Sequence, residues 1–352
     1  MAQKDSEKGV TILICTYNGA GRLDPTLNAL TVQKKTQNIP WEVILVDNAS
    51  TDNTSEVAQQ IMGKSGISFT LLFEPNPGRD NALRKGFEHA RYEYVCNVDD
   101  DTWVCNDYVS LVWEIMTEHP EVAVCGGCGT GAFETTPPDW LKNFESALAL
   151  GPQGEKAGYV SEERSYLYGA CAVYRKSLWF MLHNSGFQFF LSGRKGKKLS
   201  SGEDFELCQA WKLAGYQLWY DPRISFQHFM PSGRLTWPYF RKLFKAFGRS
   251  DLVTQQYFKV RGAYSSIKTY FIGKYILYIG YELYQTFKKL PKYLYALLFT
   301  NTGNKIILDM EREWALFSEL LKNRKRYLAI KSVLSDAQWI QKIKNKQKNK
   351  CT

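Results

Sequence analysis

Three consecutive carboxylates, Asp99, Asp100 and Asp101, follow the apolar stretch "YEYVCNV" (residues 92–98). Like charges at close range repel each other, and desolvation at the end of a buried strand increases the cost. Alternate carboxylates suit a hard divalent cation such as Mn2+ or Mg2+, which prefers oxygen ligands and commonly brings a phosphate group. The triplet therefore predicts a binding site for a metal ion that carries a diphosphate. The alternative is a solvated acidic turn.

A second pair of carboxylates, Glu203 and Asp204, opens the stretch "GEDFELCQAWKLAGY" (202–216), which is typical of a loop followed by a helix. One interpretation is helix capping, since carboxylates are favourable in the first turn of a helix. The other is catalysis, because a positioned carboxylate can take the proton from an attacking hydroxyl. The two interpretations are compatible, since a cap position also fixes the direction of a base.

The elements that must position these residues alternate along the first hundred residues. Helical patterns separate four apolar runs at 10–15, 41–47, 67–73 and 92–98. This order predicts an α/β fold with a mostly parallel central sheet flanked by helices. Ligands bind beyond the carboxyl ends of such strands. The clusters "TYNGAGR", "DNASTD" and "DDD" follow three of these runs, so we expect them to converge on one crevice.

Charge divides the chain into two parts. Residues 1–234 hold 22 Lys/Arg and 28 Asp/Glu, a balance of −6, whereas residues 235–352 hold 23 and 7, a balance of +16. We interpret 1–234 as a catalytic domain and 235–352 as a basic, aromatic-rich helical region. Its apolar stretches 270–283 and 291–300 are short or interrupted for a spanning helix of about 20 residues. The region therefore predicts helices lying on a membrane surface.

Cysteine usage and the first ten residues indicate a reducing compartment. "MAQKDSEKGV" lacks an apolar signal region, and most of the eight cysteines lie within apolar runs. The pair in "CGGC" (125–128) is interpreted as a strand that runs into a Gly-rich turn, because a zinc site needs further ligands and there is no second pair. Residues 217–228 are predicted to form two short extended segments. We expect a cytoplasmic protein at the inner face of the cell membrane.

The motifs occur in an order that resembles the family 2 glycosyltransferases, which have the GT-A (Rossmann-like) fold and use nucleotide-sugar donors. The resemblance covers roughly residues 9–230. It is carried by "VTILICTYNGAGRL", "VILVDNASTDNT", "NPGRDNALRKGF", "YVCNVDDDTWV", "YGACAVYRKSLW" and "GEDFELCQAWKLAGY".

The resemblance implies roles for the donor-binding residues. Thr16, Tyr17 and Asn18 would line the nucleobase pocket, and Asp47 would accept from the base or ribose, with Asp52 nearby. Asp99 and Asp101 resemble the ends of the family's DxD motif, in which Asp101 would bind the metal and Asp99 the ribose or metal. Asp100, between them, would be a spectator in the donor site.

The resemblance also implies the remaining site residues. Asp204 resembles the catalytic base, Glu203 its usual neighbour, and His228 a further metal or diphosphate contact. Gly169 and Ala170 resemble the small-residue turn beside the donor sugar. The arginines that would reach the diphosphate are Arg79 and Arg84, although Leu83–Arg84 replaces the family's usual "ARN" run. Sugar stacking is conceivable for Trp103 and Trp140, but packing is favoured.

The predicted activity is inverting transfer of a sugar, with a UDP-sugar favoured, to a hydroxyl of a polysaccharide or lipid-linked glycan. Mn2+ or Mg2+ would assist, and the oligomeric state is not readable. A sugar nucleotidyltransferase is one alternative, but "TYNGAGRL" is a poor match to its expected Gly/Arg/Lys-rich turn. A nucleic-acid-binding protein that uses the basic tail is another; the acidic first 234 residues count against it. The intact carboxylate pairs disfavour a catalytically silent scaffold.

Overall fold

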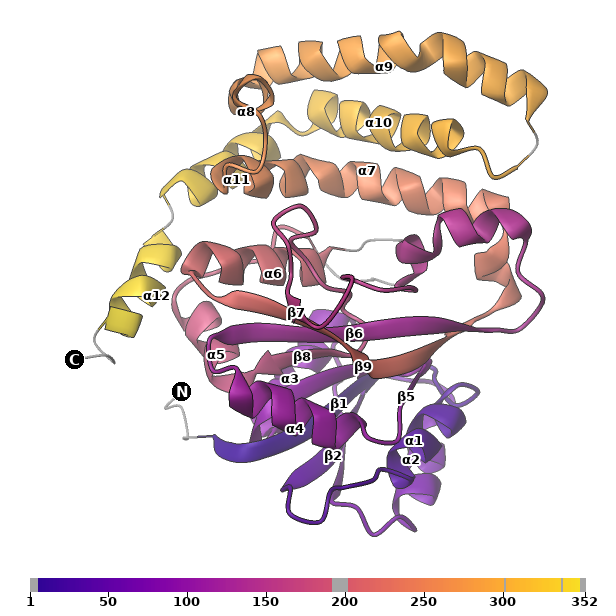
Figure 1. The fold of residues 1–352 in the computed structure, drawn as a ribbon, viewed down its shortest axis with the longest axis vertical. Helices are drawn as coiled ribbons and strands as arrows, with labels where there is room; N and C mark the ends of the chain where they lie inside the picture. Colours follow the sequence, from indigo (N-terminus) through magenta and orange to yellow (C-terminus); the bar gives the residue numbers. More distant parts are fainter. Residues whose placement is uncertain (1–5, 192–201, 301, 337, 349–352) are drawn as a thin grey trace.

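The computed structural model describes residues 6–191, 202–300, 302–336 and 338–348. A mixed sheet forms its centre, with the strand order β3-β2-β1-β4-β8-β6-β9-β5 and with β7 beside β9 (Figure 1). The strands are β1 Glu7–Thr16, β2 Trp41–Asp47, β3 Phe69–Phe73, β4 Tyr92–Asp99, β5 Thr102–Val104, β6 Val122–Phe133, β7 Gly158–Tyr159, β8 Ala172–Arg175 and β9 Gln217–Met230.

The first four strands pair in parallel, as the sequence pattern predicted. The remaining strands make the sheet mixed, because β8 runs antiparallel to β4 and β6, whereas β9 runs parallel to β6. The helices of this part are α1 Leu23–Thr31, α2 Thr54–Met62, α3 Arg79–His89, α4 Tyr108–Glu118, α5 Lys176–Asn184 and α6 Glu203–Ala214, with short 3-10 turns η1 Asp139–Asn143, η2 Glu145–Leu148 and η3 Ser232–Leu235.

Both faces of the sheet are covered, which explains the continuous apolar runs. Ile12 and Ile14 of β1 pack in one cluster with side chains of α1, α2 and α4. Leu13, between them, points to the other face and packs in a cluster with side chains of α3, α5 and α6. Successive side chains of a strand point to opposite faces of the sheet, so β1 contributes side chains to the hydrophobic clusters on both faces.

Two expectations about the middle of the chain are wrong. The stretch 217–228 belongs to one long strand, β9, and "CGGC" lies inside β6 rather than in a turn. The β6–β9 register shifts between Gly126 and Cys128, where Gly126 pairs with Tyr220 and Cys128 with Ser225. This irregularity accommodates Pro222, which has no N–H for a ladder hydrogen bond. At Gly127 a Cβ would lie 1.7 Å from the carbonyl oxygen of Ile224, so the strands approach too closely there for a side chain.

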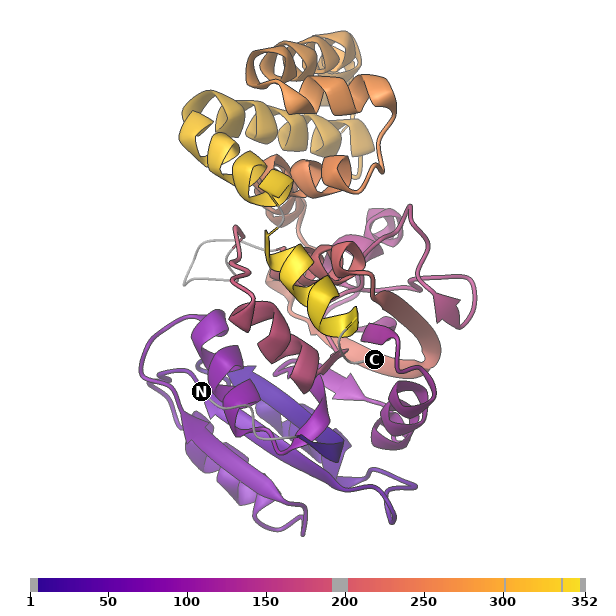
Figure 2. The ribbon, with the colours of Figure 1, turned by 90° about the vertical axis from the view of Figure 1, so that its left-hand side faces the viewer.

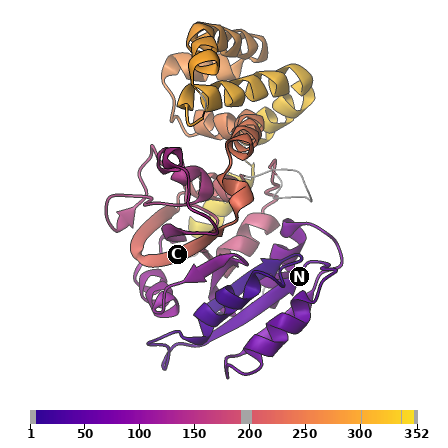
Figure 3. The same cartoon turned by 90° about the vertical axis from the view of Figure 1, so that its right-hand side faces the viewer.

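The C-terminal region is helical, as expected. Its helices are α7 Trp237–Val260, α8 Ser266–Gly273, α9 Tyr275–Phe299, α10 Lys305–Lys322, α11 Arg324–Asp336 and α12 Gln338–Lys348. The helices α7, α10 and α9 form successive layers above the sheet, with α9 outermost (Figures 1 and 3). The last helix, α12, runs back beside α5 and α6 (Figure 2). Across the described residues, no helix combines the length and apolar character that crossing a membrane requires.

The helical region shares hydrophobic clusters with the sheet region. Leu191 and Phe205 pack with Tyr257 of α7 and with side chains of α8 to α11. Trp339 and Ile340 of α12 join the cluster of α3, α5 and α6. The division near residue 234 therefore remains a prediction about function, because the two parts do not have separate interiors. Most of the Gly/Lys-rich stretch 192–202 lies outside the described residues.

Candidate functional site

Each aspartate of the "DDD" triplet faces an arginine from a different element. Asp99 lies 3.0 Å from Arg79 at the start of α3. Asp100 lies 2.7 Å from Arg22, which precedes α1. Asp101 lies 3.3 Å from Arg234 of η3 and 3.4 Å from the Nε2 atom of His228 on β9. The like charges at the end of β4 are thus tolerated because cations converge on them.

Asp100 fastens the first loop to the end of β4. Its carboxylate accepts a hydrogen bond from the hydroxyl of Thr16 at 2.6 Å, in addition to the Arg22 ion pair. The hydroxyl of Thr26 donates to its backbone oxygen at 3.1 Å. Burial raises the pKa of Asp100, while Arg22 opposes that shift. Asp100 thus holds the loop in place, and its role in donor binding stays a prediction. The hydroxyl of Thr16, which was assigned to the nucleobase pocket, is bonded to Asp100 in this structure.

Asp101 and His228 form the most buried part of the cluster. The Nδ1 atom of His228 lies 3.0 Å from the carbonyl oxygen of Leu148. A carbonyl only accepts, so Nδ1 carries a proton, and Nε2 is left facing the Oδ1 atom of Asp101. Two groups that can both accept therefore face each other, an arrangement that suits a cation between them.

The chemistry of these donors fits a hard divalent metal, although the donors are not gathered. Within the described parts of the chain, no group of three His, Cys, Asp or Glu side chains is assembled as a metal site. The carboxylates of Asp99 and Asp101 instead face Arg79 and Arg234. Two carboxylates and an imidazole match the ligand preference of Mn2+. A metal at Asp101 would take over the charge balance that Arg234 now supplies.

The second carboxylate pair joins the same cluster through Arg79. Its guanidinium reaches the Oε1 atom of Glu203 at 2.9 Å while it pairs with Asp99. The following residue, Asp204, accepts hydrogen bonds from the backbone N–H of Gly169, at 2.9 Å, and of Phe205. Burial, reinforced by the charge of Glu203, raises the pKa of Asp204 to about 6. A carboxylate with a pKa near neutrality is suited to general-base chemistry.

The predicted small-residue turn supports Asp204 directly. The amide of Asn97, on β4, donates to the carbonyl oxygen of Gly169 at 2.9 Å, so the Gly169 peptide is held between Asn97 and Asp204. A Cβ at Gly169 would lie 3.1 Å from the Cβ and Oδ2 atoms of Asp204. Ala170 is buried beneath this turn. A larger residue at Gly169 would displace the carboxylate.

The loops after β1 and β2 are tied to each other. The side chain of Asn18 accepts from the N–H of Thr51 at 2.8 Å. Asp52 accepts a hydrogen bond from the N–H of Ala20 at 3.3 Å. Asp47 accepts hydrogen bonds from the N–H of Ser50 and from the hydroxyl of Ser55 in α2. The polar groups assigned to the nucleotide thus also hold these two loops together, and Tyr17 is exposed on the first of them.

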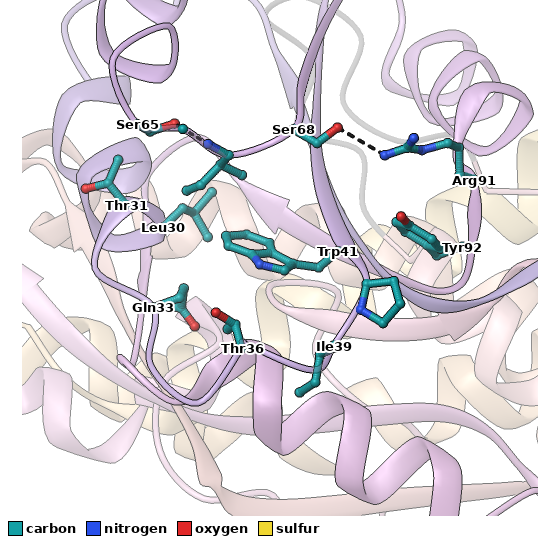
Figure 4. A pocket seen from close by; sticks show the side chains of 13 residues that line it. Leu30, Thr31, Gln33, Thr36, Ile39, Trp41, Ser65, Ser68, Arg91 and Tyr92 are labelled. Atoms are coloured by element: carbon teal, nitrogen blue, oxygen red, sulfur yellow. Dashed lines mark hydrogen bonds between the residues drawn. The ribbon is translucent and has the colours of Figure 1, made fainter.

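Two cavities lie near different edges of the sheet. One, of about 230 Å3, adjoins Asp204 and is lined by α3, α5 and α6, including Arg84, Phe87 and Trp179. Arg84 thus borders this cavity. The other, of about 510 Å3, lies at the amino ends of the parallel strands around Trp41 and Tyr92 (Figure 4). Because ligands of such sheets bind at the carboxyl ends, we assign the first cavity to the site.

Sequence reasoning missed three residues of the cluster. Arg22, Asn97 and Arg234 were not assigned, yet they contact Asp100, Gly169 and Asp101. Arg22 is the last residue of the cluster "TYNGAGR", so its place after the first strand could have indicated a site residue. No sequence motif marked Arg234. Trp103 stacks on Phe229, and Trp140 packs against Trp237 and Phe240, in agreement with the favoured packing interpretation.

The helix that carries Asp204 is anchored on the C-terminal region through Glu206. This buried carboxylate accepts from the N–H groups of Phe190 and Leu191 and from the hydroxyl of Tyr257 on α7. Burial raises the pKa of Glu206 to about 7, despite these donors. The folded chain therefore binds this proton more tightly than the unfolded chain does. Protonation of Glu206 therefore adds to the free energy of unfolding. This contribution is complete below pH 4.5 and is lost as the pH rises through about 7.

We expect the free energy of unfolding of Glu206→Gln to exceed that of the wild type at about pH 8, by on the order of 2–3 kcal/mol, and to exceed it by much less at about pH 5. The amide oxygen can accept both backbone N–H groups, and the NH2 group can donate to Tyr257, so the geometry survives. Urea unfolding at both pH values measures the difference. The exposed Glu155→Gln is the control for one lost charge, and the same stability difference at both pH values would contradict the assignment.

Comparisons with known proteins find one family whose model matches part of the chain. Residues 11–180 match the family model described as "Glycosyl transferase family 2". The poly-beta-1,6-N-acetyl-D-glucosamine synthase of Staphylococcus aureus (strain MSSA476) is 32% identical over 126 residues, which are 35% of this chain and 29% of that protein. The synthase of Staphylococcus epidermidis is 28% identical over 120 residues, 34% of this chain and 28% of the relative. The alignments thus span less than a third of these relatives.

A solved mannosyltransferase from Pyrobaculum calidifontis, in complex with GDP-Man and Mn2+, superposes with a TM-score of 0.51 at 18% identity, over 96% of this chain and 88% of that one. This likeness concerns the fold, which is that of a GT-A glycosyltransferase. Residues 11–180, just under half of the chain, match glycosyl transferase family 2, as the motifs predicted. The family and the enzyme class predicted from the motifs are thereby confirmed.

Proposed function

We propose that the chain transfers a sugar from a nucleoside-diphosphate sugar to a hydroxyl of a polysaccharide or lipid-linked glycan, with inversion at the anomeric carbon. The observation that carries the proposal is the Arg79 bridge, which joins Asp99 at the end of β4 to Glu203 beside Asp204. The bridge brings the donor-binding strand end and the base-carrying helix into one cluster. An in-line displacement needs this juxtaposition of leaving group and base.

Asp204 is the proposed general base. Above about pH 6 its carboxylate is ionised and can take the proton of the acceptor hydroxyl. The N–H groups of Gly169 and Phe205 hold its two oxygens in a fixed direction. The cavity beside it, which is lined by residues of α3, α5 and α6 together with Asn97 of β4, offers a place for the acceptor next to the base.

The proposed metal is Mn2+ or Mg2+, held by Asp101 with Asp99 and His228. When bound, such a metal stabilises the negative charge of a departing diphosphate. Arg79 supplies a further positive charge at the same strand end. The buried position of Asp101 makes it the stronger candidate ligand, whereas Asp99 is a third exposed and accessible to a ribose.

The donor is proposed to be a UDP-sugar and the acceptor a growing glycan. The names of the staphylococcal relatives support a polysaccharide product, since they are synthases of an N-acetylglucosamine polymer. Location at the inner face of the membrane remains part of the prediction.

Release of free nucleoside diphosphate from a panel of UDP- and GDP-sugars tests the reaction class. We expect release from one donor in the presence of Mn2+, loss of release in EDTA, and stimulation by a suitable glycan. Binding of UDP and GDP, measured by calorimetry with Mn2+ and with EDTA, covers the case of a missing acceptor. Absence of both release and metal-dependent nucleotide binding would contradict the proposal.

A further inference from the structure

The outermost helix, α9, turns an apolar face to solvent. Twenty large apolar side chains are exposed among the described residues, and eleven of them lie between Ile267 and Phe299. The outer face of α9 consists of Ile276, Leu277, Tyr284, Phe287, Leu294, Tyr295 and Leu298, which are 37–76% exposed. Their spacing of three, four, seven or eight residues places them on one side of the helix. At 1.5 Å per residue, this helix is about 37 Å long.

Several polar side chains of α9 face the protein instead. Glu282 and Thr286 are buried against the neighbouring helices, and Lys289 pairs with Glu313 of α10. Tyr278 donates to Gln255 of α7. A surface helix normally buries its apolar side, whereas α9 exposes most of its large apolar side chains and buries Glu282 and Thr286. An exposed apolar stripe of this length marks an interaction site.

The charges beside the outer face are of one sign. Between Ser266 and Phe299 the chain has five lysines, and its one acidic residue, Glu282, is buried. Lys274, Lys288 and Lys292 are exposed on α9 or at its start. Two copies that met through this face would bring these lysines together, since a two-fold contact joins identical patches. A negatively charged apolar surface is complementary to both features.

We propose that the outer face of α9 lies in the headgroup region of a membrane that contains anionic lipids. Tyrosines and phenylalanines are favourable at that depth, and lysines beside them attract anionic headgroups. The inner face of α9 is covered by α10, so the helix would lie in the plane of the membrane. The layers of α10 and α7 then stand between the lipid and the sheet (Figure 1). This inference goes beyond the proposed transfer reaction and does not depend on the donor or acceptor.

Co-sedimentation of the full chain with vesicles tests the inference. We expect binding to vesicles of phosphatidylcholine mixed with phosphatidylglycerol, weaker binding to phosphatidylcholine alone, and weakening by salt. Lys288→Gln with Lys292→Gln should weaken binding to the mixed vesicles on the order of tenfold or more. Phe287→Ser with Leu298→Ser should weaken binding to both vesicle types.

Matched controls separate this face from the rest of the surface. Lys342→Gln with Lys344→Gln removes two exposed charges from α12, and Val32→Ser with Phe73→Ser removes two comparably exposed apolar side chains from the sheet region. Both controls should bind as the wild type does. Equal losses in the α12 variant would assign lipid binding to the basic tail and overturn the inference. A dimer in sedimentation velocity that Phe287→Ser with Leu298→Ser dissolves, without vesicle binding, would also overturn it.

Discussion

Replacement of Asp204 by Asn is expected to reduce sugar transfer about 10²–10⁴-fold while nucleotide binding stays within a few-fold of the wild type. The amide keeps the size of the carboxylate but cannot accept a proton from the acceptor hydroxyl. Because burial and Glu203 raise the pKa of Asp204 to about 6, the wild-type rate should rise with pH up to that value and then level off. Steady-state rates across this range, together with calorimetric binding of UDP, provide the measurement.

A matched control is Asp24→Asn, which neutralises an exposed carboxylate in the first turn of α1. It should leave rate and pH profile unchanged. An Asp204→Asn variant that transfers at close to the wild-type rate would exclude Asp204 as the base. If the variant loses nucleotide binding as well, its melting temperature tells whether α6 has lost its anchorage.

Replacement of Asp101 by Asn is expected to weaken Mn2+-dependent UDP binding about 100-fold, whereas binding in EDTA changes little. Asp101 is buried and faces both His228 and Arg234, so it has the position of a principal metal ligand. Calorimetry of UDP with Mn2+ and with EDTA measures the effect. Titration of Mn2+ alone, followed by its electron paramagnetic resonance signal, detects the metal without any reaction.

Asp100→Asn is the control within the same triplet. Its carboxylate is engaged by Thr16 and Arg22, so we expect lower thermal stability and preserved Mn2+-dependent binding. Equal loss of metal-dependent binding in both variants would show that the triplet acts as a general acidic cluster. Unchanged binding in Asp101→Asn would remove Asp101 from the proposed metal site.

The order of strands and helices in the first half of the chain was predictable because local patterns encode it. The runs at 10–15, 41–47 and 92–98 lie in β1, β2 and β4, and "DDD" follows the end of a buried strand as expected. A strand buried on both faces needs consecutive apolar residues, and a helix needs capping and periodicity. These requirements concern neighbours in sequence, so the sequence reveals them.

The path of the middle region was less predictable. The sequence pattern predicted two extended segments over 217–228, yet one strand, β9, continues through Pro222. The proline is accommodated by the shifted register against β6, where Gly127 lets the strands approach. Whether a strand survives a proline depends on the facing strand, and that pairing is not a local property.

The sequence by itself determined the α/β class, the motif order, the basic helical C-terminal region and the identity of the candidate base. The tertiary structure decided how the carboxylates are neutralised, with Arg22, Arg79 and Arg234 reaching three adjacent aspartates. It also decided that Tyr257 of α7 anchors the helix of Asp204, and that α9 turns its apolar side outward. Charge neutralisation and burial depend on which segments, distant in sequence, come into contact. The order of the strands and the packing of the helices determine these contacts.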